Sequence, residues 1–340
     1  MNRRTPAIVL SALLAVSAAS AQSYKVVSRT KVGGAGGWDY VNADEVGRRL
    51  YIARSGMGAR ITVFNLDTLA PEGEVANVAA RGVAISTKSG HAFATSKPVV
   101  MFDTKTLAEI KRIDVEGGPD GSLWDPFNDR VYILSHRAPN VTVLDAKDGA
   151  VLGTLDLDGA PEQAVTDGKG HIYIDIEDKD NIAVVDAKAM KVTAHYDIAG
   201  KGGTCAGLAM DVKNNLLFAA CRKPQNMVIL NAADGKVITT LPLGVGTDGA
   251  VFNPKTMEAF SSQGDGTLTV IRENSPTSFE VSQTVETMVS GKTLALDGKT
   301  GRVLVIAGEF GPPAPPAQPG GRAGRGPIID GSFSILTVAK

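Results

Sequence analysis

The sequence predicts an all-β fold, a seven-bladed β-propeller of four-stranded antiparallel blades. Three observations predict it. Short β-type segments recur with a period of roughly forty residues, which is typical of propeller blades. Glycine is abundant, at 38 of 340 residues, as expected where many tight turns join short strands. No apolar spacing typical of an amphipathic helix follows residue 21.

The recurrent unit is clearest in its two middle strands. An apolar strand such as Tyr51-Ile52-Ala53 or Tyr132-Ile133-Leu134 is followed, after a loop, by one such as Val141-Thr142-Val143-Leu144-Asp145. A short strand of small residues precedes this pair, and a more polar strand follows it. Alternation with period two gives each unit two faces to bury, and neighbouring blades in a ring bury both faces.

The chain divides into seven such units. They begin near Trp38, Ala80, Gly118, Ala160, Lys201, Val245 and Val289. The second, sixth and seventh units match the pattern less closely, which leaves six or eight blades as the alternative count. The last unit lacks a fourth strand, because the chain ends at Lys340 just after its third. Residues 24–32 alternate like a strand, so we expect this N-terminal strand to complete the last blade and close the ring.

The pattern carried by Tyr51-Ile52-Ala53, Tyr132-Ile133-Leu134 and Val141-Thr142-Val143-Leu144-Asp145 resembles the YVTN-type seven-bladed propeller repeats of exported bacterial and archaeal surface proteins. The resemblance covers essentially the whole chain after the leader. It implies the fold and says little about activity, since the family includes periplasmic proteins without established catalysis and surface-layer-like binding proteins. One branch binds single-stranded DNA, and lactonases and quinoprotein dehydrogenase subunits are more distant relatives by fold.

Residues 1–21 have the pattern of a secretory signal peptide. Arg3 and Arg4 precede a short apolar run over residues 8–16, and Ala19-Ser20-Ala21 fits a cleavage site between small residues. We therefore expect a single mature domain, residues 22–340, that is periplasmic or secreted and has no membrane span after cleavage. An uncleaved N-terminal anchor is the alternative.

Charged residues are expected to gather at one mouth of the central channel, where propellers usually bind ligands. Those before or early in the first strand of a unit are Asp39, Arg81, Asp120, Glu162, Asp248 and Lys292. Polar residues at the end of the second strand are Arg54, Lys97, His136, Glu177, Arg222, Gln263 and Glu309. Together they predict a ring of mixed charge. It either binds an anionic or zwitterionic ligand or pairs internally as a solvated rim.

Cys205 and Cys221 are the only two cysteines. Cys205 begins the first strand of the fifth unit and Cys221 ends its second strand. A turn centred on Lys213 therefore places them opposite each other in one hairpin. An exported compartment permits a disulfide between them, and two buried thiols are the alternative.

The sequence contains no spacing typical of a metal, haem or nucleophile site, and we expect no cofactor. The four histidines lack the spacing of zinc or copper ligands, and Cys-x-x-Cys-His is absent. No nucleophile-elbow motif occurs in a strand-to-helix context. Acid–base chemistry of the kind that a propeller lactonase needs is offered only by His136 with Glu177 at the mouth.

Residues 311–327 are rich in Pro and Gly and interrupt the last unit between its second and third strands. This composition predicts a disordered or extended polyproline segment. It is either a flexible arm that brings Arg322 and Arg325 to a partner or a tolerated surface insertion.

The net charge of −1 argues against a broad nucleic-acid-binding surface. We therefore expect an exported, monomeric, non-catalytic binding or scaffold protein, with a protein or small-molecule partner at one mouth. Two alternatives stay open. One is a lactonase-like hydrolase. The other is a single-stranded nucleic-acid-binding protein, which needs stacking aromatics, and of the two tryptophans only Trp38 lies near the expected mouth.

Overall fold

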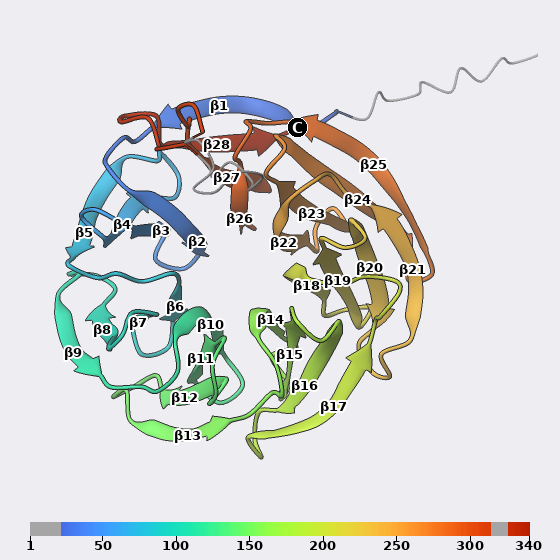
Figure 1. Ribbon diagram of the computed structural model, residues 1–340, viewed down its shortest axis with the longest axis horizontal. Coiled ribbons are helices and arrows are strands. Elements are labelled where there is room, and N and C mark those ends of the chain that lie inside the picture. Colours follow the sequence, from blue (N-terminus) through green and yellow to red (C-terminus); the bar gives the residue numbers. More distant parts are fainter. Residues whose placement is uncertain (1–21, 314–325) are drawn as a thin grey trace, which may run out of the picture.

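Seven blades stand in a ring around a central axis, and each blade is a four-stranded antiparallel sheet. Figure 1 shows the ring in the computed structural model, viewed along that axis. The structure describes residues 22–313 and 326–340. The predicted signal peptide, residues 1–21, and residues 314–325 of the Pro- and Gly-rich segment lie outside the described residues.

Within a blade the strands follow one another from the centre outward (Figure 1). Blades 1 and 2 contain β2 (Gly37–Asp44), β3 (Arg49–Ser55), β4 (Arg60–Asn65), β5 (Pro71–Ala76), β6 (Val83–Ser86), β7 (His91–Ala94), β8 (Val99–Asp103) and β9 (Glu109–Ile113). Blades 3 and 4 contain β10 (Pro119–Asp125), β11 (Arg130–Ser135), β12 (Val141–Asp145), β13 (Val151–Leu155), β14 (Pro161–Thr166), β15 (His171–Ile176), β16 (Asn181–Asp186) and β17 (Lys191–Asp197). Blades 5 and 6 contain β18 (Cys205–Asp211), β19 (Leu216–Cys221), β20 (Asn226–Asn231), β21 (Val237–Pro242), β22 (Thr247–Asn253), β23 (Glu258–Gln263), β24 (Thr267–Ser275) and β25 (Ser278–Glu286).

The seventh blade takes its outermost strand from the other end of the chain. Its strands are β26 (Lys292–Asp297), β27 (Arg302–Ala307), β28 (Ser334–Ala339) and β1 (Lys25–Lys31). β1 pairs antiparallel with β28, from Lys25 opposite Ala339 to Lys31 opposite Ser334. The predicted seven-bladed all-β fold and its closure by the N-terminal strand are therefore confirmed, and the alternative counts of six or eight blades are excluded.

A short polar residue closes the hairpin between the first and second strands of every blade. In each case its side-chain oxygen accepts a hydrogen bond from a backbone N–H two or three residues later. The residues are Asp44, Ser86, Asp125, Asp167, Asp211, Asn253 and Asp297. This local bond favours a turn over continued strand, which explains why the chain reverses once per repeat at the same place.

Seven hydrophobic clusters form the core, one between each pair of neighbouring blades. Between blades 7 and 1, the ring centroids of Trp38 and Phe333 are 5.4 Å apart. Between blades 1 and 2, those of Tyr51 and Phe102 are 6.2 Å apart. Because both faces of a blade are apolar, each blade depends on both of its neighbours for burial.

The two ends of the described chain meet on blade 6. The Tyr24 hydroxyl donates a 2.6 Å hydrogen bond to the Glu258 carboxylate, which is only 1% exposed. The Lys340 ammonium lies 3.2 Å from the same carboxylate and 4.7 Å from the centre of the Tyr24 ring. Burial, together with Glu258, raises the pKa of Tyr24 above its ordinary range, so the phenol stays a donor. These contacts add polar bonds to the strand pairing that closes the ring.

Replacing Tyr24 with Phe removes the hydroxyl that bonds to the buried carboxylate. We expect Tyr24→Phe to lower the free energy of unfolding by about 1–3 kcal/mol, since hydrogen bonds to charged groups are the stronger ones. Tyr196→Phe is the matched control, because its hydroxyl donates to the Ala232 carbonyl at 3.0 Å and its loss should cost about 0.5–1.5 kcal/mol. Urea unfolding measures the free energy of unfolding of both variants. A loss in Tyr24→Phe equal to or smaller than that in Tyr196→Phe would contradict a special role of the Tyr24–Glu258 bond in ring closure.

A buried carboxyl pair, Glu273 and Asp211, lies between blades 5 and 6. Glu273 and Asp211 are both buried, and each keeps one carboxyl oxygen without a hydrogen-bond partner among the described residues. The other Glu273 oxygen accepts a 2.6 Å bond from the Asn214 amide. Burial, and then the charge of Asp211, raises the pKa of Glu273 to about 7. The folded protein therefore holds a proton here that the unfolded chain releases at lower pH.

This raised pKa predicts that stability falls as the pH rises from about 4.5, the ordinary Glu value, through about 7. The glutamine in Glu273→Gln cannot ionise. Between about pH 5 and pH 8, the free energy of unfolding of this variant should therefore fall by roughly 1–3 kcal/mol less than that of the parent. Glu280→Gln, in the same blade and exposed, is the control. Urea unfolding at the two pH values tests this, and identical pH dependence of parent and Glu273→Gln would refute it.

Candidate functional site

One end of the ring carries the loops that lead into the first strand of each blade and those that leave the second strand. We call this end the mouth. Six of the seven first strands have a register shift just as they begin, the exception being β6. The residues at or beside these shifts include Asp39, Asp120, Glu162, Asp248 and Lys292. A β-bulge turns a side chain out of the regular alternation, which explains how charged residues face the axis while the strand below stays apolar.

Ion pairs link these side chains around the mouth. Asp39 of blade 1 lies 3.0 Å from the guanidinium of Arg81 in the next blade and 3.8 Å from the ammonium of Lys292 in the previous one. Lys292 also lies 3.1 Å from Asp248 of blade 6. Each charge therefore contacts a partner on a neighbouring blade, and this part of the mouth is close to neutral.

Blade 5 has no charge at the start of its first strand, where Ala206 stands in place of an acid or base. Arg222, at the end of its second strand, fills the gap. Its guanidinium pairs with Asp248 on one side and lies 2.9 Å from Glu177 of blade 4 on the other. It also donates to the backbone carbonyl of Thr247. One arginine therefore connects three blades.

The remaining arc is acidic. The His136 Nε2 atom lies 3.1 Å from Glu162 and 3.4 Å from Asp120, and Asp120 is 3.8 Å from Arg81. The hydrogen bond with Glu162 and the charge of Asp120 raise the pKa of His136 to about 8. Burial, and then Glu162, raises the pKa of Asp120 to about 6. Burial and the same Glu162 raise the pKa of Glu177. This arc therefore has fewer positive than negative groups.

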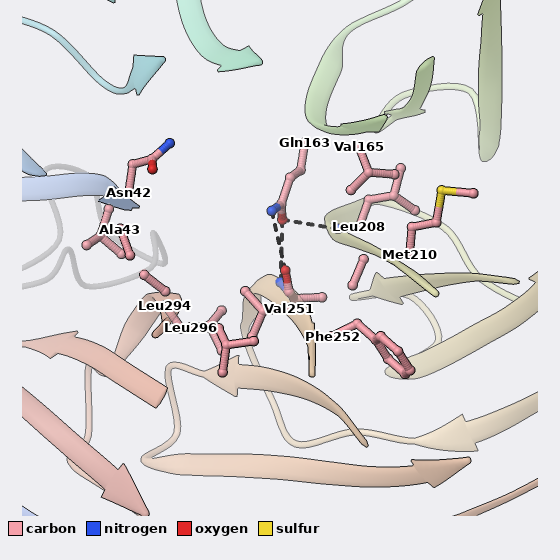
Figure 2. A pocket seen from close by; sticks show the side chains of 14 residues that line it. Asn42, Ala43, Gln163, Val165, Leu208, Met210, Val251, Phe252, Leu294 and Leu296 are labelled. Carbon is pink, nitrogen blue, oxygen red and sulfur yellow. Dashed lines mark hydrogen bonds between the residues drawn. The ribbon is translucent and has the colours of Figure 1, made fainter. Parts of the chain in front are cut away.

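Two side chains close the channel beneath the ring of charges. The Tyr40 hydroxyl of blade 1 donates to the Glu162 carbonyl of blade 4, at 3.1 Å. The Gln163 amide accepts a 3.1 Å bond from the backbone N–H of Leu208 in blade 5 and bonds at 3.4 Å to the backbone of Ala250 in blade 6. Figure 2 shows Gln163 reaching between these strands. The charged mouth is thus separated from the channel below.

Most of the side chains that line the channel below Tyr40 and Gln163 are apolar. A cavity of about 330 Å³ is lined by side chains that include Leu208, Phe252, Leu294 and Leu296, with Asn42 as one of its few polar groups (Figure 2). The Asn42 amide donates to the Val83 carbonyl of the next blade at 3.1 Å.

Two predicted mouth residues do not join the ring. Arg54 is 1% exposed, and its guanidinium lies 3.6 Å from the centre of the Phe333 ring. It donates to carbonyls of residues 33–37, including Gly37 at 3.1 Å. Lys97 donates to the Gly117 carbonyl at 2.7 Å. Both bind backbone near their own blades because loop carbonyls lie closer to them than the ring does.

Two further polar residues at the ends of second strands also form their contacts within their own blades. Gln263 is buried and bonds to the Ser261 carbonyl at 2.8 Å, and Glu309 pairs with Arg29 at 2.6 Å. Trp38 is buried against Phe333, so its ring is not free to stack on a base. Sequence position therefore indicated the correct loops without saying which of their side chains turn toward the axis.

Cys205 and Cys221 face each other across β18 and β19 and form a disulfide, with an S–S distance of 2.03 Å. Arg222 directly follows Cys221. The bridge therefore covalently fixes the strand end that is followed by Arg222, whose guanidinium contacts blades 4 and 6.

Sequence reasoning did not find the contacts that His136 makes. It paired His136 with Glu177, but in the described residues no hydrogen bond or ion pair joins them. Asp120, His136 and Glu162 instead bring ligand atoms within 4.8 Å of one another. These groups come from the first and second strands of blade 3 and the first strand of blade 4. Applying the adjacency of successive blades to the repeat alignment would have revealed this grouping.

Comparisons with known proteins identify the fold. No family model matches the sequence, and no curated protein matches it. Among 1674 matching chains of solved structures is one from the crystal structure of the mitotic checkpoint complex, with a TM-score of 0.72 and 13% identity. The alignment covers 90% of this chain and 96% of that one. At this identity the likeness shows a shared propeller fold and no more.

Among the described residues, no helix is both apolar enough and long enough to span a bilayer.

Removing Arg222 should be costly, because it leaves Glu177 and Asp248 without their main counter-charge. We expect Arg222→Ala to lower the free energy of unfolding at pH 7 by about 1–3 kcal/mol. Arg112→Ala is the matched control, since Arg112 pairs with Glu109 within one exposed outer strand at 2.8 Å and should cost at most about 0.5 kcal/mol. Urea unfolding distinguishes the two, and equal costs would show that the ring pairs contribute no more than surface pairs.

Proposed function

We propose that this protein is an exported propeller of the YVTN type that works as a non-catalytic scaffold, with a protein partner docking on the mouth. Three observations support export and the repeat type. The leader over residues 1–21 has the signal pattern. The Tyr-Ile and Val-Thr-Val-Leu-Asp strands recur through the chain. The disulfide between Cys205 and Cys221 suits an oxidising compartment such as the periplasm or the cell exterior.

The observation that carries the docking proposal is the charged ring above a closed channel. A ligand that met the mouth would reach Tyr40 and Gln163 before the channel, so recognition takes place on the face of the disc. The ring side chains hold one another through ion pairs between blades. The charge pattern is thus fixed before a partner arrives, which lowers the ordering cost of binding.

Exposed apolar side chains also lie on this face, in loops of the adjacent blades 6, 7 and 1. They belong to loops at the mouth and are Met57, Val245, Val289 and Ile329. Exposed apolar groups beside fixed polar groups are typical of protein-binding surfaces. The structural neighbour comes from a protein complex, which is consistent with a propeller face serving as a docking platform. A protein partner therefore fits this face better than a small molecule.

Crosslinking from the two ends of one blade tests which face docks. A photo-crosslinking residue would replace Met57, 82% exposed at the mouth, or Val46, 75% exposed at the opposite end of blade 1. We expect a discrete protein adduct in cells from position 57, none from position 46, and a several-fold weaker adduct when Arg81→Glu reverses one ring charge. Equal adducts from both faces, or none from position 57, would contradict docking at the mouth.

Two assays on the purified chain address the rival functions. Lactone or ester turnover that disappears in His136→Ala and Glu177→Ala would support a hydrolase in place of a scaffold. Single-strand binding that weakens steeply with salt would support a nucleic-acid function. The scaffold proposal expects neither.

A further inference from the structure

The acidic arc of the mouth contains three groups whose ligand atoms converge. The Asp120 carboxylate, the His136 imidazole and the Glu162 carboxylate come from β10, the loop after β11 and β14. Their ligand atoms all lie within 4.8 Å of one another. Two carboxylates and one imidazole are a donor set typical of a divalent metal with borderline character.

The distances within this cluster fit a common metal ion. The His136 Nε2 atom is 3.1 Å from a Glu162 oxygen and 3.4 Å from an Asp120 oxygen. Two ligands bound tetrahedrally to zinc, with bonds of about 2.0–2.2 Å, are separated by about 3.4 Å. The two distances from His136 are therefore close to the edge of a coordination tetrahedron, and the Asp120 and Glu162 oxygens lie within 4.8 Å of each other. His136 is the most exposed of them, so the fourth position faces the solvent.

The Asp120 carboxylate supplies a second, independent observation. Its side chain is 12% exposed, and no described residue donates a close hydrogen bond to its carboxylate. Its two charged neighbours lie farther away than hydrogen-bond contact normally requires, with Arg81 at 3.8 Å and His136 at 3.4 Å. A largely buried carboxylate that has only these longer ion pairs is stabilised further by a bound cation.

The balance of charges around the mouth also favours a bound cation. Arg81, Lys292 and Arg222 pair most closely with Asp39, Asp248 and Glu177. Asp120 and Glu162 share His136, and Asp120 has in addition only the more distant Arg81, at 3.8 Å. A divalent cation would supply the charge that this arc lacks, and it would bind the imidazole through the atom that now contacts both carboxylates.

We propose that Asp120, His136 and Glu162 form a binding site for one divalent cation of the zinc type at the mouth of the propeller. The imidazole nitrogen disfavours Mg²⁺ and Ca²⁺, which prefer oxygen ligands alone. The open fourth position is occupied by water, or by a carboxylate or imidazole group of whatever docks at the mouth. The site is independent of the identity of that partner.

Calorimetric titration of Zn²⁺ into the chelator-treated mature chain tests the site, at about pH 8 to 9 where most of the imidazole is neutral. We expect one equivalent to bind. His136→Ala and the conservative Glu162→Gln should each weaken binding at least about tenfold, as loss of a ligand does at such sites. Circular dichroism and thermal unfolding confirm that both variants fold, so a loss of binding reports on the ligands.

His171→Ala is the matched control, because His171 lies 2.9 Å from Asp167 but has only this one carboxylate beside it. Its Zn²⁺ affinity should equal that of the parent. Co²⁺ offers a second readout, since tetrahedral coordination gives intense visible absorption that the His136→Ala variant should lose. An unchanged affinity in His136→Ala and Glu162→Gln, a loss confined to His171→Ala, or no binding by the parent would each overturn the proposal.

Discussion

Closure of the ring by β1 and β28 is the constraint on which the rest of the structure depends. A propeller blade has two apolar faces, and both are buried only when a neighbour stands on each side. The seventh interface, between blades 7 and 1, exists because strands from the two ends of the chain pair in one sheet. Trp38, Phe333 and the guanidinium of Arg54 pack there. Tyr24 and Lys340 then anchor both chain ends to Glu258.

The same closure determines the geometry of the mouth. With seven blades in the ring, the starts of the inner strands stand close enough for side chains of adjacent blades to form ion pairs. Tyr40 can also reach the backbone of blade 4 from blade 1. The bulges at these strand starts turn one residue per blade toward its neighbours without disturbing the apolar strand below. The result is a rigid ring of charges that is largely neutral. An excess of negative charge is confined to the arc of Asp120, Glu162 and Glu177.

Residues that depart from the repeat pattern occur where the chain has a role other than building the blades. Asp175 in β15 is fully buried and accepts a bond from the backbone N–H of Gln163, while its second oxygen has no partner among the described residues. Burial raises its pKa well above the ordinary value. Gln163 in turn closes the channel. Blade 5 replaces a charged strand start with Ala206 and carries the disulfide instead. These exceptions all border the mouth, as expected if the mouth is where function resides.

The sequence alone determined the fold, because its period, its strand alternation and its missing last strand are all local patterns. It also indicated the loops that form the mouth and the cysteines that face each other. Only the tertiary structure decided which of those side chains meet. Arg54 and Arg222 both lie where a second strand ends, but the register aligns Arg54 with Cys221 and places Arg222 one residue later. Arg54 packs on Phe333, whereas Arg222 bridges three blades. His136 contacts Glu162 rather than Glu177 because blade adjacency, bulge geometry and competing loop carbonyls set side-chain directions, and none of these can be read from spacing along the chain.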